Sequence, residues 1–266
     1  MKDYLDIDKN GQTKFKISKT NKVDNLIKEK LFNEALVEIN QVLESEINYT
    51  NLNLKGIILD NLSEYEKAIE CFDKSLKLNN CDETNIYKSN TFYNWAKVTF
   101  FPECNYDKAL ELINKSLDNI PDTQDPSEHY FLKAEILEGM NDLVEAQKSY
   151  LIAYKEFDKL KEFENQSEYL KNTSDILINI VGSDFYNFTP ENGMIVDLVK
   201  EQDNEHDPDA IAVMINNEKV GYVANSSYTL IDDVKGASDI KNEMKDSQRA
   251  EILFNYLGEY TIAKLI

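Results

Sequence analysis

Hydrophobic residues recur at intervals of three and four between residues 20 and 157, a spacing that predicts amphipathic helices. Four segments share one arrangement: an aromatic residue or leucine stands three residues before an alanine, and a large side chain follows four residues after it. Successive alanines are 33, 41 and 37 residues apart. Self-similarity at such a period is typical of a stack of repeated helical units. The four alanines are Ala35, Ala68, Ala109 and Ala146.

Each unit is predicted to contain two helices joined by a turn. In the second unit, Leu52 and Leu59 fall on one helical face, residues 61–63 provide a turn signal, and Phe72 and Ser75 fall on one face of the next helix. Three units carry a small residue in the first helix, where it allows the partner helix to approach closely. These small residues are Gly56, Ala96 and Ala134.

This arrangement resembles the tetratricopeptide repeat (TPR), and the resemblance covers residues 20–157. Val23 stands where the first unit should carry a small residue, and the third unit contains an insertion at 100–104, so three or four repeats are expected. An ordinary helical bundle is the alternative. The resemblance implies a concave surface on the first helices of the units, which would hold an extended or helical peptide. The positions expected to face this groove are Asn53, Ile57, Tyr93, Lys97, Phe131 and Glu135.

Two alternatives bear on this groove. Its rings could merely seal the stack of helices instead of binding a partner. TPR domains that bind chaperone tails hold a terminal carboxylate with Lys, Arg and Asn. The matching positions of this chain carry a different set of residues. We therefore expect a different peptide partner. The residues at the matching positions are Leu54, Asn94, Glu128 and Leu132.

The hydrophobic pattern changes beyond residue 173. Residues 158–173 keep a helical spacing and are expected to form a capping helix and linker that close the solenoid. From residue 174, short β-branched runs alternate with turn signals, which predicts strands. Asn216–Asn217 and 257–259 are predicted to turn between strands, and a polar helix is expected around 228–246. The predicted strands, which would close into a small barrel, are 176–181, 194–199, 210–215, 219–223, 252–256 and 260–265.

The sequence thus predicts an α+β multidomain chain, with an α-helical TPR solenoid at 20–157 and a closed β-barrel at 174–266. Residues 1–19 form a separate N-terminal segment. The letters from Asp6 to Gly11 imitate the opening of an EF-hand, but Lys14 and Ile17 occupy two later ligand positions, so a hairpin turning at Asn10–Gly11 explains them better. The alternating acids at 203–209 also lack the rest of a calcium loop. No metal or other cofactor is expected.

The barrel region resembles a HIRAN domain. The resemblance rests on the spacing Asn204-x-x-Asp207-x-x-Ala210, followed by a strand and then by Gly221-Tyr222. A member of this family captures the 3′ end of single-stranded DNA, which requires rings against the terminal bases, an acceptor for the 3′ hydroxyl and cations for phosphate. Carried over by position, these implied nucleic-acid-binding residues are Phe185, Tyr186, Asn204, His206 and Asp207.

The charge of the barrel region and the residue types at two positions oppose binding of a DNA 3′ end. Asp184 and His206 stand where the DNA-binding member has an arginine and a tyrosine. Residues 174–266 contain 7 basic and 17 acidic side chains, a balance of −10, which weakens attraction to phosphate. Asn204 and Asp207 could instead satisfy backbone amides in a turn, and Phe185 and Tyr186 could plug the barrel. The barrel is therefore read first as a recognition module for a molecule other than nucleic acid, with binding of a DNA 3′ end as the alternative.

Composition and charge limit the partners, the location and the chemistry that the chain can have. The whole chain carries 29 basic and 49 acidic residues, a net charge of −20 that repels nucleic acid and anionic membranes at long range. No apolar run approaches the length of a membrane span, so a cytoplasmic location is expected. The three cysteines are widely spaced and the chain contains only two histidines, which argues against disulfides and zinc. These five residues are Cys71, Cys81, Cys104, His129 and His206.

No catalytic motif can be named. The chain has no phosphate-binding loop, no nucleophile elbow and no His-Glu-x-x-His helix. The best account is a non-catalytic adaptor that binds a protein or peptide through the solenoid and carries the barrel as a second recognition surface. The first alternative is an accessory protein of DNA repair that holds a single-stranded 3′ end. A hydrolase or metal-dependent enzyme is the poorest alternative.

Overall fold

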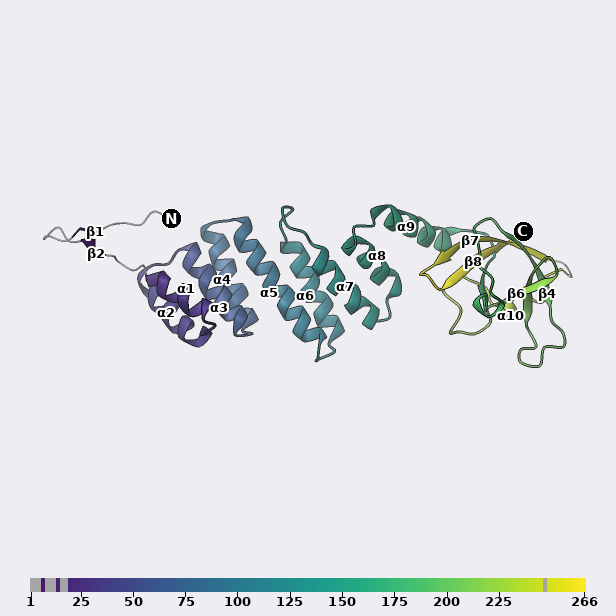
Figure 1. Cartoon of the computed structure of the whole chain (residues 1–266), viewed down its shortest axis with the longest axis horizontal. Helices are drawn as coiled ribbons and strands as arrows, with labels where there is room; N and C mark the ends of the chain where they lie inside the picture. The colour runs from purple at the N-terminus through teal and green to yellow at the C-terminus, as the bar shows by residue number, and fades with distance from the viewer. Residues whose placement is uncertain (1–5, 8–12, 15–18, 246–247) are drawn as a thin grey trace. The chain divides into compact units, whose positions relative to one another are not determined.

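The computed structural model describes residues 6–7, 13–14, 19–245 and 248–266. The chain divides into two compact units, Met1–Lys155 and Glu156–Ile266 (Figure 1). Near the N-terminus, β1 (Asp6–Ile7) pairs with antiparallel β2 (Thr13–Lys14), as a hairpin requires, while the predicted turn at Asn10–Gly11 lies outside the described residues. No helix in the described part of the chain is long and apolar enough to cross a membrane.

Helices make up the first unit from residue 19 onward, and each is joined to the next by a short connection. They form four successive helical hairpins, which confirms the predicted pairing of helices. The first helix of the third pair has 19 residues and is longer than the others at its N-terminal end, whereas the insertion at 100–104 lies almost entirely in the turn that follows it. The helices are α1 (Lys19–Lys28), α2 (Phe32–Ser45), α3 (Tyr49–Asn61), α4 (Tyr65–Leu78), α5 (Asp82–Phe100), α6 (Tyr106–Asn119), α7 (Ser127–Gly139) and α8 (Leu143–Ala153).

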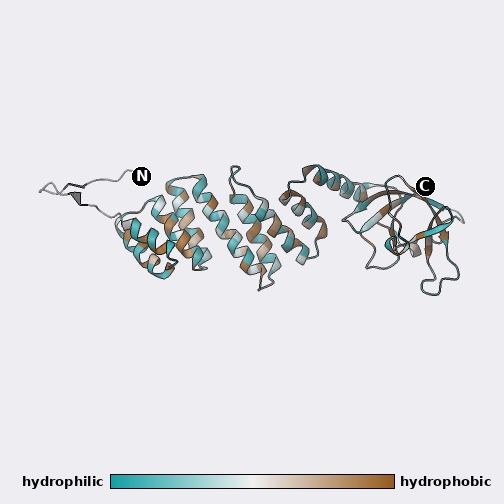
Figure 2. Ribbon diagram, in the orientation of Figure 1, coloured by the Kyte–Doolittle hydropathy of each residue, from teal (hydrophilic) through white to brown (hydrophobic). Residues whose placement is uncertain are grey.

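The small residues that defined the repeats lie at the helix contacts. Ala35, Ala68 and Ala109 are fully buried. A Cβ atom at Gly56 would lie 2.5 Å from the ring of Phe72, so only glycine allows α3 to rest against that ring. Hydrophobic and hydrophilic residues alternate along these helices, as Figure 2 shows. The small residues of the repeat therefore mark the positions at which neighbouring helices pack.

Buried serines connect the two helices of the central pairs. Ser75 of α4 donates a hydrogen bond to the carbonyl oxygen of Tyr49 in α3, at 3.1 Å. Ser116 of α6 donates to the carbonyl oxygen of Ser89 in α5 at 2.6 Å, and Ser89 returns a bond to the carbonyl oxygen of Ser116 at 2.8 Å. Ser75 and Ser116 each stand seven residues after the repeat alanine. One repeat position thus supplies a polar connection inside the core.

The second unit contains a closed six-stranded barrel, as predicted. Its strands follow one another around the barrel in the order β3-β6-β5-β4-β7-β8, and every neighbouring pair is antiparallel. Asn216 and Asn217 both adopt positive φ in the predicted turn. The strands are β3 (Leu177–Val181), β4 (Ile195–Lys200), β5 (Ile211–Ile215), β6 (Glu218–Val223), β7 (Gln248–Tyr256) and β8 (Tyr260–Leu265).

The polar helix expected at 228–246 is mostly absent from the described residues, and this prediction was wrong in extent. Only α10 (Ala237–Ile240) is helical there. Just before it, the backbone N–H of Lys235 donates to the carbonyl oxygen of Leu177. Lys235 also forms an isolated parallel β-bridge with Ile178 of β3. Pairing with a strand uses the backbone that a longer helix would need. Ala237 and Ile240 of α10 complete the barrel core.

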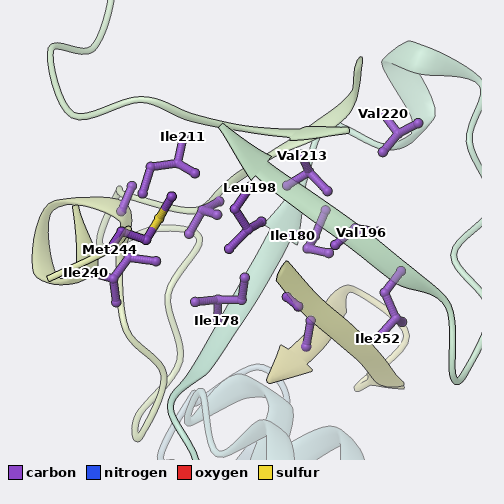
Figure 3. Close-up of a cluster of buried hydrophobic side chains, with 14 residues drawn as sticks. Ile178, Ile180, Val196, Leu198, Ile211, Val213, Val220, Ile240, Met244 and Ile252 are labelled. Carbon is purple, nitrogen blue, oxygen red and sulfur yellow. The ribbon is translucent and has the colours of Figure 1, made fainter. Parts of the chain in front are cut away.

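The barrel core consists of aliphatic side chains from all six strands and α10 (Figure 3). Ile178, Leu198 and Ile211 are fully buried within it. Backbone also packs closely: a Cβ atom at Gly221 of β6 would lie 2.7 Å from the carbonyl oxygen of Val181 in β3. This contact explains why a glycine precedes Tyr222.

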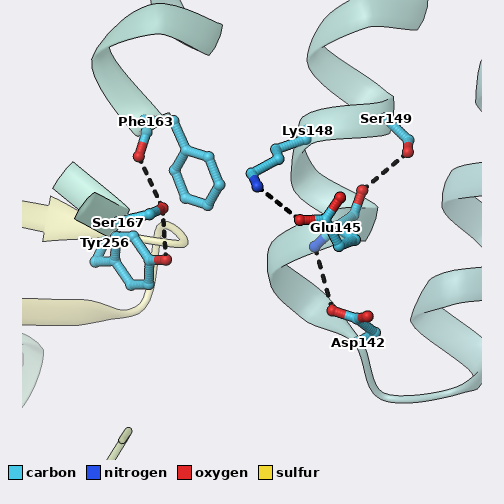
Figure 4. A network of polar contacts seen from close by, with 7 residues as sticks. All are labelled: Asp142, Glu145, Lys148, Ser149, Phe163, Ser167 and Tyr256. Atoms are coloured by element: carbon cyan, nitrogen blue, oxygen red, sulfur yellow. Dashed lines mark hydrogen bonds and ion pairs between the residues drawn. The ribbon is translucent and has the colours of Figure 1, made fainter. Parts of the chain in front are cut away.

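Helix α9 (Phe157–Asn172) corresponds to the predicted capping helix at 158–173, but it groups with the barrel in the second unit. The ring of Phe163 stacks on Tyr256 of β7, with centroids 5.0 Å apart, and the Ser167 hydroxyl lies 2.8 Å from the Tyr256 hydroxyl (Figure 4). The two units therefore divide after Lys155, whereas the sequence pattern changes at 173/174.

Candidate functional site

Three aromatic side chains gather on the barrel surface after β3. The short 3-10 helix at Asp184–Tyr186 carries Phe185 and Tyr186, and Asn187 ends it in the left-handed conformation. Phe185 is 83% exposed, and its ring meets Tyr186 edge-on with centroids 5.2 Å apart. Tyr186 in turn lies 6.4 Å from Tyr222 of β6. An exposed ring supported by two partly buried rings is suited to stacking against a flat ligand.

A charged network lies beside these rings. Glu201, which directly follows β4, forms an ion pair with Lys219 of β6. Its Oε2 accepts hydrogen bonds from the Tyr222 hydroxyl at 3.0 Å and from Asn204 Nδ2 at 2.9 Å. Lys219 Nζ also donates to the Tyr222 hydroxyl at 2.7 Å and lies 4.7 Å from the centre of that ring. The lysine charge is thus already paired within the protein.

The network shifts the pKa of its members. Burial acts to raise the pKa of Glu201, but hydrogen bonds from Lys219, Asn204 and Tyr222 outweigh it and hold that pKa below the usual value. The bond to Glu201 raises the pKa of Lys219 well above its usual value. Burial and the neighbouring Tyr222 raise the pKa of Tyr186. At neutral pH the site therefore holds the carboxylate of Glu201, the ammonium group of Lys219 and the neutral phenol of Tyr186.

The loop before β5 is held by side chains of its own. Asn204 Oδ1 accepts from the backbone N–H groups of His206 at 2.9 Å and Asp207 at 3.0 Å. Asp207 Oδ1 accepts from the N–H of Asp209 at 2.8 Å, and its Oδ2 accepts from Asn225 Nδ2 at 2.9 Å. Both carboxylate oxygens of Asp207 are thus engaged in shaping the loop. A ligand hydroxyl would have to share one of them.

The residues predicted to line the solenoid groove differ in exposure. Asn53 is only 5% exposed, and its Nδ2 donates to Thr84 Oγ1 at 2.8 Å, so its side chain joins α3 to α5. Ile57 and Glu135 are half-buried, and Lys97 is exposed. Asn53 is therefore buried between helices, whereas Ile57, Lys97 and Glu135 reach the surface at least in part.

Two aromatic residues of the predicted groove pack against neighbouring rings. Tyr93 of α5 lies 5.0 Å from the ring of His129, and burial together with Glu128 and Glu135 raises the pKa of Tyr93. Phe131 of α7 is 37% exposed. It meets Tyr150 of α8 and Tyr154, which directly follows α8, edge-on, with ring centroids 5.5 and 6.1 Å away. These rings could serve either packing or partner binding.

Comparison with known proteins identifies the barrel. Residues 174–233 match the HIRAN domain. The match begins before β3 and ends beyond β6, so β7 and β8 lie outside it. No curated protein matches this chain.

Solved helical structures show weak similarity to the chain. One crystal structure of MamA is 18% identical, covers 53% of this chain and 77% of its own, and gives a TM-score of 0.37. MamA residues 41 to the end from Desulfovibrio magneticus RS-1 are 20% identical, cover 56% of this chain and 94% of their own, and give a TM-score of 0.36.

Within the HIRAN domain, the structure brings several predicted residues into contact. Phe185 touches Tyr186, and Asn204 joins the charged network through Glu201. His206 is exposed, and only its backbone takes part in the bonds described above. The sequence analysis named Tyr222 only as part of the family motif and did not identify Glu201 or Lys219 as site residues. Only the pairing of β4, β5 and β6 brings these three side chains together.

Proposed function

We propose that this chain is a non-catalytic adaptor, in which the solenoid binds a peptide of a partner protein and the HIRAN domain is a second recognition module. The observation that carries the proposal is the exposed ring of Phe131, which is held in place by Tyr150 and Tyr154. Aromatic side chains that are rigid and yet exposed are enriched at sites of protein binding. Phe131 and Tyr93 occupy equivalent positions of adjacent repeats, three residues before Ala134 and Ala96.

Peptides selected against the full chain test this proposal. We expect the double variant Tyr93→Ala, Phe131→Ala to bind them at least about tenfold more weakly, as fluorescence anisotropy would measure, because each ring is an anchor of the kind that dominates interfaces. Tyr228→Ala is the matched control, since Tyr228 is 93% exposed on the HIRAN unit. Unchanged affinity of the double variant for every selected peptide would refute the groove.

One observation favours a second function, recognition of a single-stranded nucleic-acid end. The 83% exposed ring of Phe185 stands beside Tyr186 in a domain that matches HIRAN. Stacking of a base on such a ring contributes about 1–3 kcal/mol. The net charge of −10 over residues 174–266 opposes binding, and Lys219 is already paired with Glu201. Any affinity must then depend on stacking more than on phosphate contacts.

Oligonucleotides with a free or a blocked 3′ hydroxyl separate this function from the first. If the HIRAN domain recognises an end, the free end binds more tightly and Phe185→Ala weakens binding by about tenfold. Asp207→Asn should remove the preference for the free hydroxyl, provided that circular dichroism shows an intact fold. Equal and weak binding of both ends, unaffected by Phe185→Ala, would exclude this function.

A further inference from the structure

A pocket of about 210 Å³ opens in the solenoid between α3 and α5. The predicted groove residue Ile57 forms one wall, Tyr87 forms another, and the fully buried ring of Phe72 lies behind them. The polar lining comes from Asp60 and from residues of α5. The pocket therefore combines an apolar wall with one carboxylate.

The Asp60 carboxylate has one satisfied oxygen and one unsatisfied oxygen. Oδ2 accepts a hydrogen bond from Asn94 Nδ2 at 3.0 Å. Oδ1 is buried and has no hydrogen-bond partner in the described part of the chain. Burial raises the pKa of Asp60, while Thr91 and Asn94 oppose the rise. The negative charge of this carboxylate at the pocket favours a cationic ligand.

The rest of the lining contains no positive charge that could compensate Asp60. Asn90 is exposed at the pocket, and its side chain makes no hydrogen bond to the residues that the structure describes. The Tyr87 hydroxyl donates to Glu83 at 2.8 Å, which places a second carboxylate next to the Tyr87 wall. The pocket thus offers acceptors, a negative charge and an unused amide, which together suit a cation.

The size of the pocket limits the ligand. Sites for whole cofactors or drug-sized ligands usually have volumes of about 300–1,000 Å³. A volume of about 210 Å³ is smaller and suits one extended side chain. Ile57 and Tyr87 would contact the methylene stem of such a chain, while its head reaches Asp60. Long cationic side chains bury their stems in this way.

We propose that this pocket binds the ammonium group of a lysine side chain on the peptide that the solenoid recognises. The inference rests on the proposed adaptor function and names the chemistry of its partner. A guanidinium group binds best to both oxygens of a carboxylate, and Oδ2 of Asp60 is already bonded to Asn94. An ammonium group is a point charge with three donors, which can approach the Asp60 carboxylate beside Asn94 and bond to the Asn90 amide oxygen.

Nuclear magnetic resonance of the full chain tests the pocket with Nα-acetyl-lysine methylamide as the probe. We expect this probe to shift the side-chain amide signals of Asn90 and Asn94 at millimolar concentration and to lower the pKa of Asp60, because a cation stabilises the carboxylate. The norleucine analogue has the same stem without the charge. At equal concentration, its shifts of these signals should be at least about tenfold smaller than those of the lysine probe. The arginine analogue should also bind more weakly than the lysine probe.

Two variants decide whether Asp60 is responsible. Asp60→Asn keeps the size of the side chain and should abolish the difference between the lysine and norleucine probes. Asp118→Asn removes the same charge from an exposed position of α6 and should leave that difference intact. Asn90→Ala should weaken the lysine probe without loss of fold. Equal shifts by both probes, or lysine binding that persists in Asp60→Asn, would overturn the inference.

Failure of the pocket can be distinguished from failure of the adaptor function. If selected peptides bind in a manner that requires Tyr93 and Phe131 but the lysine probe does not bind, the pocket inference is wrong and the groove remains. If the lysine probe binds through Asp60 but no peptide depends on Tyr93 and Phe131, the groove proposal is wrong instead.

Discussion

The hydroxyl groups of Ser167 and Tyr256 lie 2.8 Å apart and join α9 to β7 inside the second unit. Phe163, one turn earlier on α9, stacks on the same tyrosine ring at 5.0 Å. Both α9 residues are buried. Helix α9 is therefore part of the folded unit that contains the HIRAN domain, although the family match begins only at residue 174.

This contact predicts how the second unit responds to substitution. Tyr256→Phe should lower the free energy of unfolding by about 1 kcal/mol through loss of a buried hydrogen bond, and Phe163→Ala should lower it by about 3–5 kcal/mol through loss of packing. Urea denaturation of the full chain, with hydrogen exchange of α9 and β7, measures both effects. The exposed neighbour Glu164→Ala is the control. If Phe163→Ala left the exchange of β7 unchanged, α9 would not support the barrel.

The close contact of β6 with β3 predicts a strong effect at Gly221. A methyl group there would meet the carbonyl oxygen of Val181 at 2.7 Å, so the strands would have to separate. Gly221→Ala should cost about 1–3 kcal/mol of stability, as overpacking usually does. Thermal denaturation followed by circular dichroism tests this, with Gly258→Ala as a contrast, since that turn glycine is open in space but has φ of +74°. Wild-type stability of Gly221→Ala would contradict the close packing of β6 against β3.

The ion pair between Glu201 and Lys219 predicts an unusual gain of function. Glu201→Gln removes the charge that neutralises Lys219 and should raise affinity for single-stranded oligonucleotides. If one more phosphate is neutralised, the gain is about fivefold near ~0.1 M salt, and the salt dependence becomes steeper. Filter binding across a salt series measures both. Glu205→Gln changes an exposed charge of the neighbouring loop and should have less effect; equal gains in the two variants would show that only net charge matters.

His129 predicts a pH dependence of solenoid stability. Burial lowers the pKa of this imidazole below its usual value of 6.5, although Glu128 opposes the shift, and its Nδ1 has no partner among the described residues. The unfolded chain therefore takes up a proton that the folded chain resists, so stability should fall as pH drops below about 6.5 and level off once the folded pKa is passed. His129→Phe should lack this part of the decline in urea midpoints between pH 7.5 and 5.5. Parallel pH profiles of the wild type and His129→Phe would show that His129 does not cause the decline in stability.

Local chemistry in the sequence predicted much of the fold. The repeat alanines marked the helix contacts because only small residues fit where two helices touch. Asn216 and Asn217 marked a hairpin because asparagine tolerates the positive φ that both adopt. Such features depend on nearby residues alone, and they are visible in one sequence.

Long-range pairing could not be predicted in the same way. The helical pattern of 158–173 predicted a helix that closes the solenoid, whereas α9 groups with the barrel, and the pattern could not show this because Phe163 would suit either apolar surface. Asp60 was one of 49 acidic residues, and only the position of α5 beside α3 makes its Oδ1 unusual. The charged network of Glu201 likewise depends on strand order, which periodicity does not reveal.

The buried serines of α4 and α6 affect how the solenoid opens. Ser75 and Ser116 tie their helices to the preceding ones, whereas the equivalent position holds Val42 in the first repeat and Ala153 in the last, neither of which has a hydroxyl group. Each repeat is stabilised mainly by its neighbours. Fraying should therefore spread inward from both ends, and amides of the two middle repeats should be the last to exchange with deuterium.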